Sequence, residues 1–193
     1  YTMQDHTRAI HCTIRSLWLR EPFVLVGHSL GSLLATRYAH TYPRDVGQLV
    51  LLSPPVYPPL KTITSRSART RNALLLKLYR ALRTHPRGTP ATFRRLTKIL
   101  PIAASITTHP ETWTPFIRTL EQCIEQQTIA NDIRRIRAPI DIFYGNLDSV
   151  VVGYNIHALQ TVQYVTIHRL HAVNHEIGKR YASAVARYLL ARL

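Results

Sequence analysis

Three residues of this sequence could together perform nucleophilic catalysis: Ser29, Asp148 and His175. A serine hydroxyl is a weak nucleophile until a neighbouring imidazole accepts its proton, and the imidazole works best when a carboxylate fixes its tautomer and stabilises its cation. We therefore predict Ser29 as the nucleophile, His175 as the general base and Asp148 as the acid that orients the histidine. This chemistry requires no cofactor, and the other histidines show no metal-ligand spacing.

Ser29 stands at the centre of the pentapeptide Gly27-His28-Ser29-Leu30-Gly31. The apolar run Phe23–Val26 before it predicts a strand, and a helical pattern to about Thr41 follows it. A serine at the apex of so tight a turn leaves no room for Cβ atoms two residues to either side, which would explain both glycines. The turn would hold the hydroxyl beside a helix N-terminus, where the Leu30 N–H could stabilise a developing oxyanion.

The acid and the base are predicted at the ends of two later strands. Asp148 follows the apolar run Ile140–Tyr144, and His175 follows the predicted strand Gln163–His168. A final amphipathic helix begins at Ile177, directly after this histidine. Because functional residues of a parallel α/β sheet lie just beyond the carboxyl ends of its strands, we expect the three side chains at one edge of the sheet.

The residues alone leave alternatives open for the acid and for the base. Asp141 competes with Asp148, although it falls within a predicted strand rather than beyond it. His171 competes with His175 in the same loop. His28 is expected to pack beside the turn, because its position next to the nucleophile directs its side chain away from the hydroxyl.

The order of the predicted elements indicates an α/β fold with a mostly parallel sheet of about four strands and flanking helices. The run Phe23–Val26 does not alternate between apolar and polar residues, which is typical of a strand buried on both faces. The other predicted strands and the helices between them lie at 48–52, 140–144 and 163–168, and at 5–19, 30–41, 155–160 and 177–193.

An insertion interrupts this alternation between residues 54 and 138. Helices are predicted there at 91–100 and 113–126, after a longer amphipathic helix that carries one apolar stripe. The members of that stripe are Leu74, Leu75, Leu78, Tyr79 and Leu82. The chain therefore divides into a core at 1–53, the insertion at 54–138 and a second core segment at 139–193.

The formal net charge is +15, and no acidic residue occurs between Asp45 and Glu111. Such a segment could attract an anionic surface, an acidic substrate or nucleic acid. No nucleic-acid motif accompanies the charge, so we expect no nucleic-acid partner and keep an anionic surface as the expectation. No apolar run approaches the length of a membrane span. Cys12 and Cys123 are expected to be buried thiols of a reducing compartment, with the cytoplasm as the default location.

Taken together, these motifs resemble the α/β-hydrolase superfamily. Residues 27–31 resemble its nucleophile elbow, Gly145–Asp148 its acid turn, and His175 the loop histidine that precedes the last helix. The helix containing Tyr1–His6 resembles the helix before the elbow in small members. The resemblance favours His175 over His171 and identifies the insertion as a helical cap that covers the site.

The resemblance implies an esterase-like serine hydrolase that acts on a small acyl substrate. Ester, thioester, lactone and amide bonds all stay open, and so does acyl transfer to another nucleophile, such as perhydrolysis. Family members with dehalogenase or epoxide hydrolase activity carry an aspartate at the nucleophile, so Ser29 argues against those activities. A catalytically silent binding module with the same fold is the alternative from another class.

The chain departs from the family upstream of the elbow. Only 28 residues precede Ser29, and they contain no His-Gly or Gly-Gly loop for the second oxyanion donor. Loss of one such donor typically costs about 10² to 10³ in rate. The strand Phe23–Val26 would also become an edge, which invites self-association. We interpret the chain as the C-terminal part of a longer hydrolase or as one half of a complex.

Overall fold

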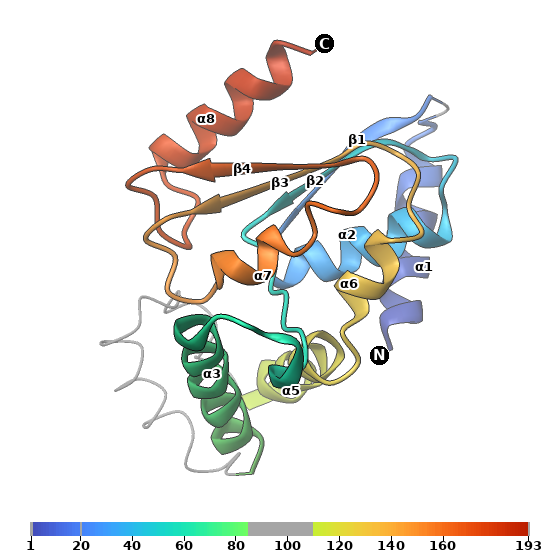
Figure 1. Cartoon of the computed structure of the whole chain (residues 1–193). Helices are drawn as coiled ribbons and strands as arrows, with labels where there is room; N and C mark the ends of the chain where they lie inside the picture. Colours follow the sequence, from blue (N-terminus) through green and yellow to red (C-terminus); the bar gives the residue numbers. More distant parts are fainter. Residues whose placement is uncertain (1, 20, 85–109, 193) are drawn as a thin grey trace.

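The computed structural model describes residues 2–19, 21–84 and 110–192 (Figure 1). Four strands form one sheet in the order β1-β2-β3-β4, and every neighbouring pair is parallel. This arrangement confirms the predicted fold class. The helix predicted at 91–100 lies outside the described residues.

The strands are β1 (Phe23–His28), β2 (Val46–Leu52), β3 (Ile140–Gly145) and β4 (Val165–Leu170). The first three predicted runs fall inside observed strands, whereas the fourth strand begins two residues after the predicted start. Apolar side chains face one another across the sheet at matched positions, for example Leu25 with Leu49, Leu51 with Ile142, and Ile142 with Ile167. All four strands therefore bring their carboxyl ends to the same edge.

Helices cover both faces of the sheet (Figure 1). On one face lie α1 (Met3–Ser16), α2 (Leu30–Thr41), α6 (Thr128–Ile133) and α7 (Gly153–His157), and on the other lies α8 (Lys179–Leu190). The larger core cluster forms under the first group and includes Leu33, Tyr38, Leu49, Ile133 and Ile142. A smaller cluster forms under α8 and includes Val50, Phe143, Tyr181 and Val185.

Strand β1 lies at the edge of the sheet and is not buried on both faces. The side chains of Val24 and Val26 are 36% and 46% exposed, whereas Phe23 and Leu25 pack against the larger core. The prediction of two buried faces is therefore wrong, because α8 packs on the central strands and leaves this face of β1 uncovered. The predicted edge position of this strand is confirmed among the described residues.

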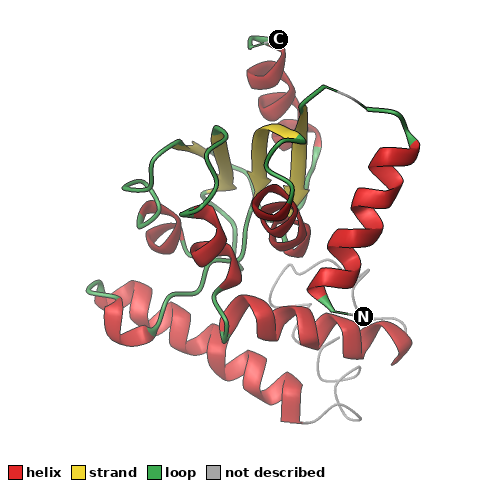
Figure 2. Cartoon of the chain, turned by 90° about the vertical axis from the view of Figure 1, so that its right-hand side faces the viewer, coloured by secondary structure: helices red, strands yellow, loops and turns green. Residues whose placement is uncertain are grey.

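The insertion contributes η1 (Leu60–Thr62), α3 (Arg66–Thr84) and α5 (Pro110–Ile124). Figure 2 shows α3 and α5 side by side, away from the sheet. Arg83 of α3 forms ion pairs with Glu121 of α5 at 3.1 Å and with Glu125, directly after this helix, at 2.6 Å. Leu74 was predicted on the buried stripe of α3 but is 64% exposed, while Tyr79 is buried. The buried stripe of this helix is therefore narrower than its sequence indicates.

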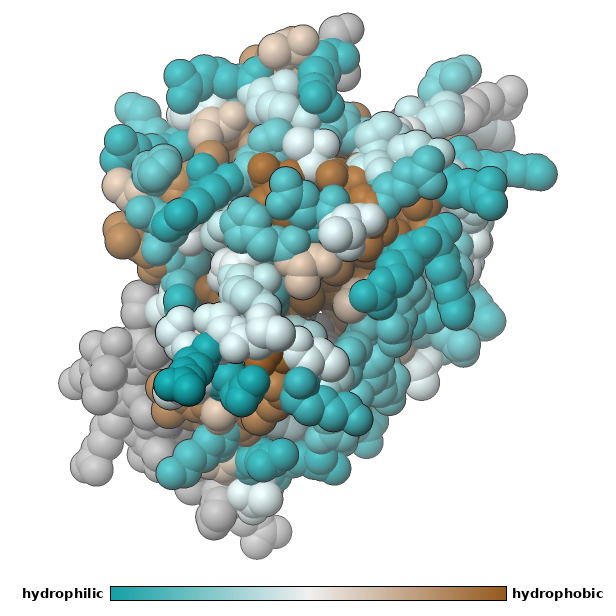
Figure 3. Space-filling model, viewed as in Figure 1, coloured by the Kyte–Doolittle hydropathy of each residue, from teal (hydrophilic) through white to brown (hydrophobic). Residues whose placement is uncertain are grey.

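The boundary of the insertion stays a prediction, and one of its segments packs with the core. Ile129 and Ile133 of α6 are buried in the larger core cluster beside α2. Hydrophilic side chains cover most of the molecular face in Figure 3, with apolar surface visible between them along the sheet. None of the described helices combines the length and hydropathy needed to cross a bilayer. Cys12 is exposed, contrary to the prediction of a buried thiol.

Candidate active site

The turn between β1 and α2 holds Ser29 in a strained conformation. Its φ of 51° and ψ of −123° lie in a region that non-glycine residues rarely adopt. The Ser29 N–H donates to the carbonyl of Leu52 at the end of β2, at 2.9 Å. Such backbone strain costs roughly 1–3 kcal/mol and persists only where the surroundings impose it. Here the strand, the helix and the neighbouring strand together fix the hydroxyl at the carboxyl edge of the sheet.

The two glycines of the turn have different reasons to be glycine. A Cβ on Gly27 would lie 2.7 Å from the Gly31 carbonyl oxygen and 2.8 Å from the Cβ of Ala35. A Cβ on Gly31 would meet no heavy atom within 4 Å in the described structure. The prediction that both positions lack room is therefore right for Gly27 and wrong for Gly31. The close approach of β1 to α2 needs only the first glycine.

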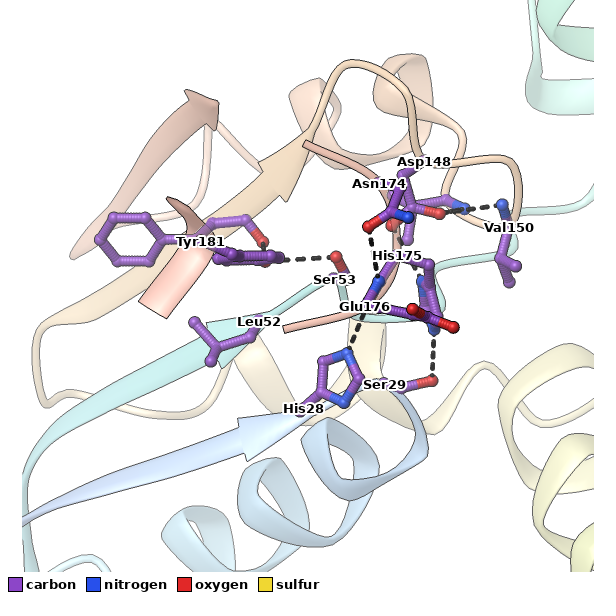
Figure 4. Close-up of polar contacts among 12 residues, drawn as sticks. His28, Ser29, Leu52, Ser53, Asp148, Val150, Asn174, His175, Glu176 and Tyr181 are labelled. Carbon is purple, nitrogen blue, oxygen red and sulfur yellow. Dashed lines mark hydrogen bonds and ion pairs between the residues drawn. The ribbon is translucent and has the colours of Figure 1, made fainter. Parts of the chain in front are cut away.

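His175 lies between Ser29 and Asp148 (Figure 4). Its Nε2 is 2.9 Å from the Ser29 Oγ, and its Nδ1 is 2.9 Å from the Asp148 Oδ2. Because an ionised carboxylate only accepts, Nδ1 carries the proton and Nε2 is free to accept the serine proton. The histidine is buried, with 7% of its surface exposed. The structure thus brings the three predicted residues together in the geometry that activates a serine hydroxyl.

Asp148 is held at both carboxylate oxygens. While Oδ2 faces His175, Oδ1 accepts from the N–H groups of Val150 and Val151, each at 2.9 Å. Burial acts to raise the pKa of Asp148, but the hydrogen bonds from His175 and from the two backbone N–H groups outweigh it and hold the pKa below its ordinary value. Asp148 is therefore an ionised, fixed acceptor.

The rival residues lie elsewhere in the structure. Asp141 is buried within β3, where Gln48, His168 and Tyr188 hydrogen-bond its carboxylate. It therefore supports the packing of α8 and does not face Ser29. His171 is exposed in the loop after β4. The structure brings His175 to the serine instead.

Two polar residues near the site were not predicted from the sequence. Ser53 follows β2 with a positive φ of 48°, and its hydroxyl is 3.2 Å from that of Tyr181. The Tyr181 hydroxyl donates to the Phe143 carbonyl at 2.9 Å, and burial raises the pKa of Tyr181 to about 12. These contacts join β2, β3 and α8 beneath the site (Figure 4). No local pattern signals them, because the two hydroxyls are 128 residues apart.

The acid loop is also tied to the first helix of the insertion. Arg71 of α3 donates to the backbone carbonyl of Asp148. Asn72 and Asn155, both buried, exchange hydrogen bonds between their side-chain amides at 3.2 and 2.8 Å. These contacts link α3 with α7 and anchor this helix of the insertion beside the acid.

The N–H of Leu30 is the predicted oxyanion donor. Helix α2 begins at Leu30, so the N–H of this residue has no acceptor in a preceding helical turn. The assignment of Leu30 as the oxyanion donor stays a prediction. No group of three or more His, Cys, Asp or Glu among the described residues could hold a metal ion.

Comparisons with known proteins agree with this architecture. The probable lysophospholipase BODYGUARD 1 of Arabidopsis thaliana is 39% identical over 57 residues, which is 30% of this chain and 12% of that protein. Among solved structures, the Paleococcus ferrophilus monoacylglycerol lipase has a TM-score of 0.58 and 20% identity, with 100% of this chain and 77% of that chain covered. The thioesterase domain from the curacin biosynthetic pathway has a TM-score of 0.56 and 17% identity, with 98% and 73% covered.

These matches differ in what they show. The two structures share the fold with this chain, while the Arabidopsis match spans about an eighth of the curated relative. The family model described as serine aminopeptidase, S33, matches residues 2–178 and therefore most of the chain. The chain thus belongs to the S33 serine aminopeptidase family of α/β-hydrolases.

Proposed function

We propose that the chain carries the catalytic triad of a serine hydrolase that cleaves a carboxylic ester, thioester, lactone or amide. The observation that carries the proposal is the hydrogen-bonded series from Ser29 through His175 to Asp148, with 2.9 Å at each step. A serine under backbone strain, hydrogen-bonded to a buried imidazole that a carboxylate orients, is the arrangement expected of an activated nucleophile.

In the proposed reaction His175 accepts the proton of Ser29 as the Oγ attacks the carbonyl carbon. The oxyanion that forms faces the Leu30 N–H, and Asp148 stabilises the imidazolium. The imidazolium then protonates the leaving group, which departs and leaves an acyl-enzyme. Water, activated by His175, releases the acid and restores Ser29. Another acyl acceptor in place of water would give acyl transfer.

The relatives support an acyl lipid as the substrate class, because the names of two of them contain lysophospholipase and monoacylglycerol lipase. The basic insertion, with the exposed Lys77 and Arg80 on α3, supports an encounter with an anionic surface. The open face and free edge of β1 support pairing with a further strand, which would bring a second oxyanion donor to the site. This chain would then be one part of a longer hydrolase or of a complex.

A fluorophosphonate probe tests the proposal directly, because it labels an activated serine without knowledge of the substrate. We expect the wild-type chain to be labelled, Ser29→Ala to be unlabelled, and Ser183→Ala, at an exposed serine on α8, to be labelled like the wild type. Labelling that persists in Ser29→Ala would overturn the assignment of the nucleophile. If a chain extended by a strand that pairs with β1 also stays unlabelled, the alternative of a silent binding module is favoured.

A further inference from the structure

His28 makes a contact that its position in the sequence does not predict. It precedes Ser29 at the end of β1, and its side chain is half-buried. The ring Nε2 is 2.9 Å from the backbone carbonyl oxygen of His175, 147 residues further along the chain. Figure 4 shows His28 reaching from the end of β1 toward the histidine loop, while Ser29 meets the ring of His175 from the other side of the turn.

The chemistry of this contact fixes the state of the His28 ring. A carbonyl oxygen has no proton to give, so Nε2 must be the donor. Burial lowers the pKa of His28, partly opposed by the hydrogen bond to His175, so the ring is kept neutral at neutral pH. The ring centroids of His28 and His175 are 5.3 Å apart. A neutral neighbour at this distance places no second charge beside the imidazolium that forms in the reaction.

This bond is the main link between the strand of the nucleophile and the loop of the base. The histidine loop is tied to the acid loop by Leu147 N–H to Val173 O and by Ala172 N–H to Asn146 Oδ1, at 3.0 and 2.7 Å. In the described part of the chain, no hydrogen bond besides the Ser29–His175 contact and that of His28 joins β1 or its turn to residues 171–178.

We propose that His28 is a positioning residue, which holds the main chain of His175 at the distance from the elbow that lets Nε2 meet the Ser29 hydroxyl. The inference rests on the proposed function of the triad. It assigns a role to the residue before the nucleophile that the sequence interpretation limited to packing. The acid loop and the histidine loop are bonded to each other. Without the His28 bond, both loops could shift together relative to Ser29, which follows a different strand.

Three substitutions of His28 distinguish the effect of its N–H donor from the effect of its aromatic ring. His28→Phe keeps a ring but removes the donor, His28→Gln places an amide N–H near the position of Nε2, and His28→Asn is an amide that is too short to reach. His171→Phe removes an exposed histidine from the same loop and serves as the control. Circular dichroism and a thermal melt show which variants are folded.

We expect His28→Phe and His28→Asn to lower the rate of fluorophosphonate labelling, and kcat on p-nitrophenyl butyrate, roughly ten-fold, which corresponds to one lost hydrogen bond. KM should change little, since His28 contacts no acyl group in the proposed mechanism. His28→Gln should recover most of the rate, and His171→Phe should match the wild type. If His28→Phe does not fold, the difference between His28→Gln and His28→Asn carries the test.

Two outcomes would overturn the inference while leaving the proposed function intact. One is a labelling rate of His28→Phe equal to that of the wild type, and the other is an equally slow His28→Gln. If the wild type itself is not labelled, the proposed function fails, and ¹⁵N NMR of the imidazoles still tests the contact. A neutral His28 ring with its proton on Nε2, protected from solvent exchange, supports it, and a proton on Nδ1 rules it out.

Discussion

Asp148 and Ser29 lie at opposite ends of one hydrogen-bonded series, yet their surroundings differ. Asp148 is 3% exposed, both of its oxygens are bound, and α3 contacts its backbone. Ser29 lies after β1, an edge strand with a neighbour on one side and two exposed valines on one face. The acid is thus held by several redundant contacts, whereas the nucleophile depends on a strained turn and a few bonds.

The acid and the base are fixed by different parts of the fold from the nucleophile. The acid and base loops are fixed by β3, β4, α7 and α3, all within the described residues. The position of the serine depends on Gly27, on the Leu52 carbonyl and on His28. We therefore expect changes on the acid side to affect chemistry without moving the serine, and changes on the nucleophile side to affect geometry and stability together.

The largest effect is expected from Asp148→Asn. The amide can still accept from Val150 and Val151, but it no longer fixes the tautomer of His175 or stabilises its cation, so kcat should fall by roughly 10⁴. The measurement is ester hydrolysis at neutral pH beside a thermal melt. Asp141→Asn, a buried aspartate outside the site, is the control and should retain the chemistry. A loss of less than ten-fold in Asp148→Asn would assign the acid role to another residue.

The second-largest effect is expected from substitution of the first glycine of the elbow. Gly27→Ala forces a Cβ to within 3 Å of the backbone of α2, so we expect a loss of roughly 1–3 kcal/mol in the free energy of unfolding and slower labelling of Ser29. Gly31→Ala is the matched variant and has open space. It should change stability by about 1 kcal/mol at most, toward a more stable helix. Equal losses in both variants, measured by urea denaturation, would contradict this account.

The third prediction concerns acid pH. Burial opposes the charge of Asp148, but its hydrogen bonds keep its folded-state pKa below the unfolded value. The ionised carboxylate therefore stabilises the fold above the unfolded pKa, and this contribution is lost as the pH falls below about 4 toward the folded-state pKa.

Urea denaturation between pH 5 and pH 2.5, a window of about 2.5 units around the carboxyl pKa, tests this prediction. The free energy of unfolding should fall less steeply with decreasing pH in Asp148→Asn than in the wild type. Val26→Thr, on the nucleophile side, should keep the wild-type slope. If the free energy of unfolding of Asp148→Asn changes with pH as steeply as that of the wild type, the pKa of Asp148 does not differ between the folded and unfolded states.

The smallest effect is expected at the open face of β1. Val24→Lys and Val26→Lys replace exposed side chains, so each should change the free energy of unfolding by about 0.5 kcal/mol or less. Leu25→Lys, on the buried face of the same strand, is the control and should unfold the chain. Light scattering should show less self-association of the Val26→Lys variant, because edge charges oppose strand pairing. Stronger association in that variant would contradict the role of this face.

Much of the fold followed from the sequence because periodicity is a local property. Apolar runs located the strands, and their alternation with helices gave a parallel sheet with common carboxyl ends. Helix α2 was predicted with its observed bounds, since the glycine turn and Tyr42-Pro43 mark its ends. The same local patterns failed for Val24, Val26 and Leu74, because the burial of a side chain depends on which helix packs over it.

The sequence by itself determined the candidate nucleophile, the two loops that hold the candidate acid and base, and the edge of the sheet on which they lie, because residue types and strand ends can be recognised without neighbours. Only the tertiary structure decided the distances between them, the separation of His175 from His171, and the contact of His28 with the histidine loop. The contacts of Ser29 and His28 with His175 join segments more than 100 residues apart, and the contact of Asp148 with His175 joins residues 27 apart. Spacing along the chain carries no information about such contacts, and the packing of strands and helices sets them.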